Sequence, residues 1–441
     1  MKEESFFSYS EDKNVHSYFA SGIIKENGAE RKFPMKQVKF IHTADLHLDS
    51  PMVGLRHLPK IIFDRLQEST FIALRNITDA AIQHEVDFIV IAGDIYDEED
   101  RSIRAQAVFR NEMNRLADKG IKAFVIHGNH DYLGGNRIQI DFPENVFFFK
   151  EQLETAAFIK SEGTVVHLYG FSYPERHVTE RWIEQYGITP GADFHIGLLH
   201  GHFEGASDHG KYAPFRLSEL LDKGYDYWAL GHIHKRALLC EQPPVVYPGN
   251  PQGRNRKEQG DKGAYIVSLS ESGSEITFFE TADIIWEEIV IDGKDAARFN
   301  DVYQLCLRTL EENRRGGKGV ILSVHIASLD SSLNEVKEKI DCGELLELLQ
   351  EEEKNESSFV WVHRLTYEEN SVINRGELIK QSDFYQELFN SIEHYDDITT
   401  ALTPLFQHSQ ARRYLSGMSE YEKEKLVQGA EKMLLELLHK N

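Results

Sequence analysis

Residues 125–135 read VIHGNHDYLGG, an apolar run that turns abruptly into an amide, two histidines and a carboxylate among glycines. β-Branched side chains such as Val125 and Ile126 are typical of buried strands, and glycine permits sharp turns that other residues oppose. Buried polar groups are costly unless they have bonding partners. The stretch therefore predicts a strand that leaves the core and ends in a polar site.

Four more apolar runs of the chain end in the same way. Their polar ends read TADLHLD (43–49), AGDIYDEED (92–100), LLHGH (198–202) and LGHIH (230–234). Helical patterns over residues 63–85 and 103–120 separate the first three runs. This alternation predicts an α/β domain with largely buried strands, whose carboxyl ends converge on one edge of the sheet, where such folds bind ligands.

The polar ends share one inventory of side chains, which combines carboxylate, amide and imidazole groups. The candidate ligands are Asp45, His47, Asp94, Asn129, His200, His232 and His234. Mixed oxygen and nitrogen ligands suit Mn²⁺, Fe²⁺ or Zn²⁺ better than Ca²⁺ or Mg²⁺. Seven ligands exceed the needs of one tetrahedral site, whereas one bridging carboxylate would give each of two metal ions four protein ligands.

The length, charge and hydrophobic content of the chain indicate what general class of protein it is. The chain has 441 residues, 41% of them hydrophobic, and a formal charge of −23 from 72 acidic and 49 basic residues. These values indicate a folded protein of two domains, or one large domain with an appendage, that does not bind nucleic acid indiscriminately. The three cysteines lack a CxxC spacing, and no apolar run is long enough to span a membrane. We expect a cytoplasmic protein without membrane attachment.

The sequence divides into four segments. Residues 1–34 form a polar leader that we expect to be poorly ordered or accessory, and residues 35–283 contain the strand pattern and its polar ends. Residues 284–380 predict a small α+β domain with a helix over 296–313, and residues 381–441 predict two or three helices. An apolar stripe on the last helix either packs within the chain or binds a partner.

The motifs DLH, GDIYD, GNHD, LLH and GHIH resemble, in this order, the signature motifs of the calcineurin-like metallophosphoesterases. FIHTADLHLDSP (40–51), YPGNPQGRNRKE (247–258) and the added C-terminal domain resemble the DNA double-strand-break repair nucleases, the branch that includes the SbcD subunit of bacterial SbcCD and the related YhaO type. The resemblance implies a four-layer αββα sandwich with a small α+β capping domain and a C-terminal helical tail.

The resemblance also implies a role for each motif residue. Asp45, His47 and His234 would bind one metal ion, Asn129, His200 and His232 the other, and Asp94 would bridge them. His130 would face the phosphate and assist the departing oxygen. The implied chemistry is two-metal hydrolysis of a phosphodiester, with Mn²⁺ the expected metal and Fe²⁺ or Zn²⁺ the alternatives.

One position departs from the pattern of the branch. Where related nucleases carry a histidine three residues after the bridging aspartate, this chain has Asp97. Asp97 could orient His130 or a metal ligand through a hydrogen bond, or be an ordinary loop carboxylate.

Other polar residues in or near the motifs can be explained by packing or by hydrogen bonds within loops. His127 and His202 lie beside candidate ligands and either touch the site or pack, whereas His42 and His167 fall within strands and are expected to pack. Asp131 is expected to cap the turn after His130.

The basic stretch GRNRKEQGDKG (253–263) is a candidate phosphate-binding segment. Arg254, Arg256 and Lys257 could contact nucleic acid, although the stretch could equally be a solvated loop. The branch implies DNA as the substrate, an SbcC-like ATPase of the SMC type as the partner, and a possible homodimer.

The sequence is compatible with three functions. The leading prediction is a DNA exonuclease, with possible endonuclease activity, in DNA repair. A small-molecule or cyclic-nucleotide phosphodiesterase is the alternative, although it would usually lack the added C-terminal domain. The third is a catalytically silent scaffold of the same fold, which the complete ligand set disfavours. A protein phosphatase is disfavoured because that class reads GDxxDRG and GNHE instead of GDIYD and GNHD.

Overall fold

The computed structural model describes two compact units. The described residues are 23–26, 29–32, 35–52, 54–55, 58–97, 102–134, 140–204, 212–354, 356–369, 375–393, 395, 398–407 and 420–439. The first unit comprises Met1–Ile291, Tyr303–His325 and Lys339–Thr366; the second comprises Asp292–Val302, Ile326–Glu338 and Tyr367–Asn441. The division thus passes through the segment 284–380, which the sequence predicts to be one small domain.

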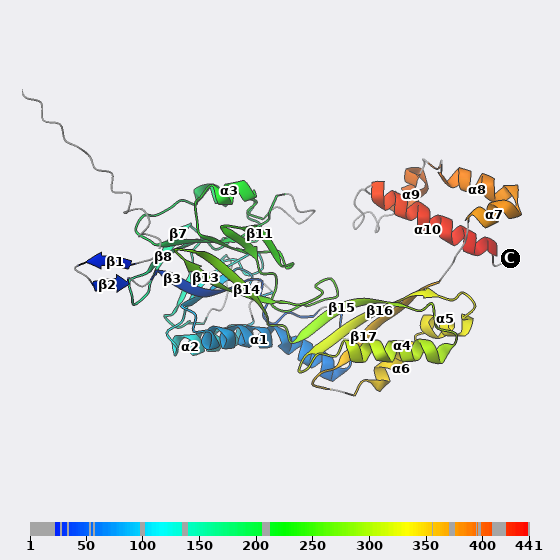
Figure 1. The fold of residues 1–441 in the computed structure, drawn as a ribbon, viewed down its shortest axis with the longest axis horizontal. Helices are drawn as coiled ribbons and strands as arrows, with labels where there is room; N and C mark the ends of the chain where they lie inside the picture. The colour runs from blue at the N-terminus through cyan, green and yellow to red at the C-terminus, as the bar shows by residue number, and fades with distance from the viewer. Residues whose placement is uncertain are drawn as a thin grey trace, which may run out of the picture. The chain divides into compact units, whose positions relative to one another are not determined.

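Two six-stranded sheets form the body of the first unit (Figure 1). One has the order β14 (Gly273–Glu280), β13 (Gly263–Ser270), β3 (Gln37–Thr43), β4 (Phe88–Ala92), β5 (Lys122–Ile126), β6 (Val146–Phe148). The other has the order β11 (Ala237–Glu241), β12 (Pro244–Tyr247), β10 (Tyr227–Gly231), β9 (Phe194–His200), β8 (Val165–Gly170), β7 (Glu154–Ile159). Strands β3 to β6 run parallel, as do β8, β9, β10 and β12.

The faces of the two sheets pack on each other through large apolar side chains. Phe40 of β3 stacks on Phe88 of β4 with ring centroids 5.1 Å apart and meets Tyr227 of β10 edge-on at 5.2 Å. Alternate residues of β4 turn the other way, so Ile89 and Ile91 belong to a second buried cluster. Because both faces of these strands are buried, they read as continuous apolar runs, as predicted.

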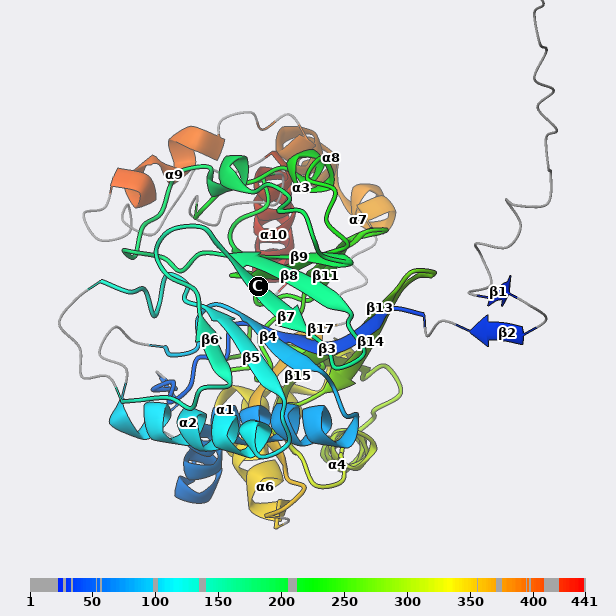
Figure 2. The same cartoon turned by 90° about the vertical axis from the view of Figure 1, so that its left-hand side faces the viewer.

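Helices α1 (Lys60–Gln83) and α2 (Ile103–Ala117) cover the outer face of the first sheet (Figure 2). Leu66, Ala73 and Ile77 lie on the buried side of α1 at helical spacing. Ser102 caps the start of α2, because its side chain accepts a 2.9 Å hydrogen bond from the Ala105 amide. The short helices η1 (Trp182–Gln185) and α3 (Leu217–Leu221) contribute to the aromatic cluster behind the second sheet. The predicted αββα sandwich is therefore confirmed, with a thin fourth layer.

The leader, predicted to be poorly ordered or accessory, contains a short hairpin. Within residues 1–34, β1 (Ile23–Glu26) and β2 (Ala29–Lys32) pair as an antiparallel hairpin. The sequence between them is Asn-Gly, the pair that favours two-residue hairpin loops. The remainder of the leader lies outside the described residues.

A third sheet follows the sandwich, with the order β15 (Ile284–Asp292), β16 (Gly319–Leu329), β17 (Val360–Glu369). Its connections contain α4 (Phe299–Glu312), α5 (Asn334–Asp341) and α6 (Glu344–Glu352), so the predicted helix over 296–313 is confirmed. Within the first unit, Arg65 of α1 donates to both carboxylate oxygens of Asp283, at 2.9 and 2.8 Å, and to the Gly317 carbonyl at 2.8 Å. These bonds fix the start of the third sheet against α1.

The second unit contains the helices α7 (Arg375–Gln381), α8 (Asp383–Glu393), α9 (Ile398–Gln407) and α10 (Glu420–His439). Leu378, Phe389 and Leu435 form its apolar cluster. The helical tail predicted from residue 381 is present. Among the described residues, no helix has the length and apolar character needed to cross a membrane.

Candidate metal centre

The five polar motifs meet where the carboxyl ends of the two sheets come together. Asp45, Asp94 and Asn129 follow β3, β4 and β5 of one sheet, while His200 and His232 lie at the ends of β9 and β10 of the other. The expectation that they converge on one edge of one sheet was too simple. Two sheets contribute, and the site lies at their shared end because the sheets pack face to face.

Backbone strain accompanies these positions. Asp45, His47, Asp94 and His232 have φ values of 53°, 44°, 51° and 99°, in the region that residues other than glycine rarely adopt. The loops are tied together by the Asp45 amide, which donates to the Gly93 carbonyl at 3.0 Å, and by the His47 amide, which donates to the Asp94 carbonyl at 3.0 Å. Such conformations persist only where surrounding bonds enforce them, and they concentrate at functional sites.

Glycines make room for one imidazole at the centre. A Cβ atom at Gly128 would lie 2.6 Å from His200 Nε2 and 2.4 Å from Asp94 Oδ1, and one at Gly93 would lie 2.3 Å from His200 Nδ1. Any side chain at these positions would displace His200. The glycines of GNHD and GDIYD are therefore needed for the close packing of the site as well as for its turns.

One group of ligands, here called cluster A, comprises Asp45, His47 and His234. Their ligand atoms all lie within 4.8 Å of one another, and the Nε2 atoms of the two histidines face each other at 3.0 Å. The Asp45 carboxylate is oriented by the His232 amide, which donates to Oδ1 at 3.0 Å. A carboxylate oxygen and two converging ring nitrogens form a ligand set that transition-metal ions accept.

A second group, here called cluster B, comprises Asn129, His200 and His232. Asn129 Oδ1 lies 3.0 Å from His200 Nε2 and 3.1 Å from His232 Nδ1. His200 Nδ1 donates to the Ala92 carbonyl at 2.9 Å, so its Nε2 faces the cluster. Asp94 Oδ2 lies 3.4 Å from His200 Nε2 and 3.8 Å from His47 Nε2, which places this carboxylate between the two clusters.

Burial and neighbouring charges set the protonation of the ligands. Burial raises the pKa of Asp45, whereas His200, acting against burial, holds the pKa of Asp94 well below its usual range. Burial and the nearby Arg254 lower the pKa of His47 to about 3, which keeps its imidazole in the neutral form that binds metals. Burial opposes the charge on His200, yet Asp94 raises its pKa to about 9. A metal ion bound at His200 Nε2 would displace that proton.

His130 lies beside the clusters and belongs to neither. Its ring Nδ1 lies 3.0 Å from the backbone carbonyl oxygen of Asp97, and its amide donates to Asp94 Oδ1 at 2.9 Å. It lines a cavity of about 810 Å³ that also exposes Asn129 and His232. The structure thus places His130 where it can reach a molecule in that cavity.

The Asp97 side chain lies in the network around His47. Its Oδ1 lies 3.0 Å from His47 Nδ1, although the ring N–H does not point along this line, and its Oδ2 accepts from Ser50 Oγ at 3.1 Å. Arg254 forms an ion pair with the same carboxylate. The Asp97 carboxylate thus lies against the outer nitrogen of a cluster A ring, and its orienting role stays a prediction.

His127 and Asp131 tie the third loop to the second. Asp131 accepts from the Gly128 amide at 2.7 Å, the Ile95 amide at 2.9 Å and His127 Nδ1 at 3.0 Å. The His127 ring stacks on Phe148 with centroids 5.4 Å apart. Asp131 bonds to the loop backbone as expected, although the amides that it binds belong to Gly128, before His130, and to the second loop. His127 packs without joining either cluster.

The two histidines that the sequence predicts to pack, His42 and His167, bond to residues outside their own sheet. His42 is fully buried between the Tyr227 hydroxyl, at 2.9 Å, and the Leu230 carbonyl, at 3.2 Å. His167 Nδ1 donates to the Thr189 carbonyl at 3.1 Å. Neither is near a ligand cluster, so the packing interpretation of both is confirmed. His202 is buried, and its amide donates to the Tyr212 carbonyl at 2.8 Å.

Sequence reasoning missed Glu258. Its Oε1 accepts from His234 Nδ1 at 2.8 Å, so it orients the ring of a cluster A residue. Its position four residues after Arg254 was the only signal in the sequence. The segment was interpreted as phosphate-binding because of its positive charge, so its carboxylate was not considered. Arg256 and Lys257 of that segment are exposed, whereas the Arg254 side chain is only 14% exposed.

An α/β sandwich of two packed sheets with metal-binding side chains gathered at one end is the architecture of a metallophosphoesterase. The model of the family "Calcineurin-like phosphoesterase" matches residues 38–236. The chain is 39% identical over 402 residues to "Uncharacterized metallophosphoesterase YhaO" of Bacillus subtilis, covering 91% of this chain and 98% of that protein. The chain therefore belongs to the calcineurin-like metallophosphoesterases, a family of metal-dependent hydrolases.

More distant relatives carry a more specific name. The chain is 26% identical over 252 residues to "DNA double-strand break repair protein Mre11" of Sulfurisphaera tokodaii, covering 54% of this chain and 61% of that protein. It is 23% identical over 341 residues to the protein of the same name from Methanopyrus kandleri, covering 69% and 68%. These relatives support a branch of the DNA-repair type.

Proposed function

We propose that the protein is a dinuclear metal-dependent phosphodiesterase that cleaves DNA, as an exonuclease and possible endonuclease of DNA repair in the cytoplasm. The observation that carries the proposal is the position of Asp94, which lies between clusters A and B and beside the cavity that His130 lines. Mn²⁺ is the metal that we expect, with Fe²⁺ and Zn²⁺ as alternatives.

The mechanism assigns a task to each part of the site. Two bound ions would supply an activated hydroxide and stabilise the charge that develops on the phosphoryl oxygens. Asp45, His47 and His234 would hold one ion, Asn129, His200 and His232 the other, and Asp94 both. His130 donates its Nδ1 proton to the Asp97 carbonyl, so Nε2 is the nitrogen left to face the substrate. A ring protonated on both nitrogens would transfer the Nε2 proton to the leaving oxygen and keep the Nδ1 proton.

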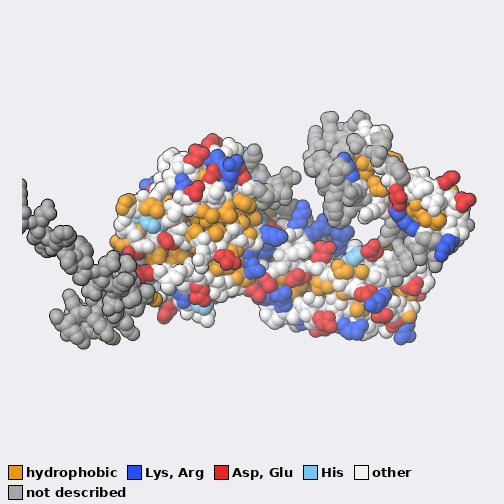
Figure 3. Space-filling view, turned by 45° about the horizontal axis from the view of Figure 1, so that its top comes forward, with side chains coloured by type: hydrophobic (Ala, Val, Ile, Leu, Met, Phe, Trp, Pro, Cys, Tyr) orange, Lys and Arg blue, Asp and Glu red, His pale blue; other side chains and the backbone are white. Residues whose placement is uncertain are grey.

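The cavity fits an anionic substrate. Arg176, Lys235 and Lys257 line it together with His130, and Lys235 and Lys257 are exposed. Figure 3 shows Lys and Arg side chains interspersed with Asp and Glu on the face drawn, so the net charge of −23 does not produce a uniformly acidic surface there. We propose that Lys257 and its neighbour Arg256 contact the DNA backbone.

The two alternative functions, a small-molecule phosphodiesterase and a silent scaffold, are tested with the same purified proteins as the DNA-cleavage proposal. A cavity of about 810 Å³ is also the size that encloses a small ligand, which favours a cyclic-nucleotide or other small phosphodiester as the second candidate. Wild type and His130→Ala should be assayed with Mn²⁺, Mg²⁺ and Zn²⁺ on end-labelled linear and hairpin DNA and on cyclic nucleotides. Cleavage of DNA by wild type alone supports the proposal; cleavage of cyclic nucleotides alone supports the alternative. Absence of cleavage by wild type on every substrate would indicate a silent scaffold, and equal cleavage by the two proteins would contradict the role proposed for His130.

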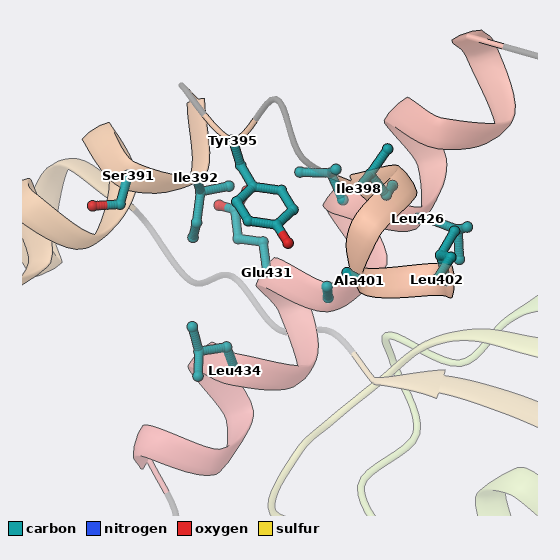
Figure 4. A pocket seen from close by; sticks show the side chains of 11 residues that line it. Ser391, Ile392, Tyr395, Ile398, Ala401, Leu402, Leu426, Glu431 and Leu434 are labelled. Atoms are coloured by element: carbon teal, nitrogen blue, oxygen red, sulfur yellow. The ribbon is translucent and has the colours of Figure 1, made fainter. Parts of the chain in front are cut away.

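A partner surface is proposed on the second unit. Ile392, Tyr395, Leu402, Leu426 and Leu434 line an apolar groove of about 420 Å³ between α8, α9 and α10 (Figure 4). Leu426 and Leu434 belong to the stripe that the sequence predicts to pack or bind, and they are 44% and 38% exposed. We propose that the groove receives an apolar helix of an SMC-type, SbcC-like ATPase.

The partner proposal is tested by co-purification. Leu426→Glu should abolish binding of the purified ATPase, whereas Val290→Glu, at an apolar position that is 65% exposed on β15, should retain it. Retained binding by Leu426→Glu would contradict the proposal. Size-exclusion chromatography of the protein alone tests the homodimer.

A further inference from the structure

Arg254 pairs with two carboxylates that each face the Nδ1 atom of a cluster A histidine. The guanidinium pairs with Asp97 and, at 3.5 Å, with Glu258 Oε1. Asp97 Oδ1 lies 3.0 Å from His47 Nδ1, and Glu258 Oε1 lies 2.8 Å from His234 Nδ1. Each carboxylate therefore faces the outer nitrogen of one ring, and both carboxylates pair with the same arginine.

The two rings present their other nitrogens to each other. His47 Nε2 and His234 Nε2 are 3.0 Å apart, which is the arrangement of two imidazoles that bind one ion. An imidazole that binds a metal through one nitrogen carries its proton on the other, and a hydrogen bond from that proton fixes the rotation of the ring. Glu258 accepts that hydrogen bond from His234 Nδ1, and the Asp97 carboxylate faces His47 Nδ1 at 3.0 Å.

We propose that Arg254 is a positioning residue of cluster A, which joins Asp97 and Glu258 into one unit that holds His47 and His234 in their metal-binding orientation. The proposal rests on the metal centre of the proposed function and is independent of its substrate. It assigns Arg254 an internal task, and it leaves DNA contact to the exposed Arg256 and Lys257.

The surroundings explain why this position needs arginine. The Arg254 and Asp97 side chains are each 14% exposed and Glu258 is 10% exposed, so two nearly buried negative charges require a cation between them. The planar guanidinium has five donors and can face both carboxylates, whereas a lysine ammonium is a single point charge.

Glu258 is held independently of the arginine side chain. Its Oε2 accepts from Asn250 Nδ2 and from the Arg254 amide, both at 2.8 Å. Because these bonds fold the 250–258 loop around the carboxylate, replacing only the guanidinium should leave the loop in place. The effect of such a replacement should therefore be confined to cluster A.

The test measures Mn²⁺ binding to Arg254→Gln. Arg315→Gln is the matched control, because Arg315 also lies between two carboxylates, Asp261 at 2.8 Å and Glu287 at 3.2 Å, away from both clusters. Calorimetric titration of metal-stripped protein with Mn²⁺ should show two sites in wild type and in Arg315→Gln. In Arg254→Gln one site should weaken by about 10- to 100-fold and the other should keep its affinity. Arg254→Lys should restore only part of the loss.

Independent measurements separate positioning from folding. Urea unfolding of the metal-stripped proteins reports whether Arg254→Gln is folded. At Mn²⁺ concentrations that saturate wild type, the electron paramagnetic resonance spectrum of Arg254→Gln should lack the spin-coupled signal of two neighbouring ions. Asp97→Asn and Glu258→Gln, which change one atom each, should weaken the same single site. If wild type binds two Mn²⁺ ions and Arg254→Gln binds them with unchanged affinity, the role of Arg254 is contradicted but the dinuclear centre is not. The same holds if Asp97→Asn and Glu258→Gln both bind Mn²⁺ as wild type does. Fewer than two sites in wild type would overturn the dinuclear centre as well.

Discussion

The imidazole of His130 is anchored by the backbone of Asp97, whose carbonyl oxygen lies 3.0 Å from His130 Nδ1. A backbone acceptor cannot be removed by changing the side chain at position 97, and it fixes the proton of the ring on Nδ1 when the ring is neutral. The Asp97 carboxylate faces His47 Nδ1 and forms an ion pair with Arg254. One residue thus contributes to two different parts of the site through two different groups.

Replacing His130 by Ala should lower kcat by about 10²- to 10⁴-fold, because a proton donor to the leaving oxygen is lost. Mn²⁺ affinity and stoichiometry should be unchanged, because the ring belongs to neither ligand cluster. Steady-state DNA cleavage together with calorimetric Mn²⁺ titration checks both parts. Loss of a metal ion in this variant would mean that His130 is a ligand.

Replacing Asp97 by Asn should have a different signature. The carbonyl that holds His130 remains, but the charge that faces His47 is lost, so the Mn²⁺ concentration needed for half-maximal activity should rise about 10- to 100-fold. Activity at saturating Mn²⁺ should approach that of wild type. A kcat that stays low at every Mn²⁺ concentration would show instead that the carboxylate acts on His130 or the substrate.

Metal removal should lower stability, since an ion that binds only the folded state stabilises it by about 2.7 kcal/mol at a free concentration of 100 times Kd. Wild type should therefore have a lower Tm in EDTA than in Mn²⁺. Asp94→Ala should abolish most of this difference, because Asp94 is the carboxylate near both clusters. Differential scanning fluorimetry measures the effect, and a full Mn²⁺-induced rise in Tm for Asp94→Ala would contradict the bridging position.

His42 should make the fold sensitive to acid. Burial lowers its pKa to about 3 from 6.5, so between these values the unfolded chain binds a proton that the folded chain does not. The free energy of unfolding therefore falls as pH decreases from 6.5 towards 3, by about 1.4 kcal/mol per pH unit for this group.

Replacing His42 by Gln, which can bond to the Tyr227 hydroxyl and the Leu230 carbonyl but does not titrate, should remove that slope. Urea unfolding of metal-stripped protein between pH 4 and 6 compares the two proteins, and the other histidines contribute equally to both. Parallel pH dependences of wild type and His42→Gln would show that His42 is not the group responsible.

The local sequence pattern was sufficient to predict the buried strands and the types of ligand at their ends. The apolar runs around Phe40, Phe88 and Val125 predicted buried strands because a strand covered on both faces selects apolar residues at every position. The polar ends predicted ligands because buried carboxylates and imidazoles need partners. The hairpin of β1 and β2 was missed although its Asn-Gly signal is local.

The contacts between segments could not be read from that pattern. Arg254 looked like a phosphate-binding residue because its neighbours are basic, and only the fold brings Asp97, 157 positions away in sequence, to its guanidinium. Glu258 received no role from the sequence, and the structure places it against His234. Spacing along the chain carries no information on which distant charge will neutralise a buried one.

The sequence by itself determined the class of fold and the kinds of side chain available to a metal, since both follow from short-range periodicity and from the chemistry of single residues. Only the tertiary structure decided how those side chains divide into two clusters, and which arginine faces inward. The reason is physical: clusters A and B each combine residues from both sheets, and the orientation of their rings depends on bonds formed when the ends of the two sheets meet.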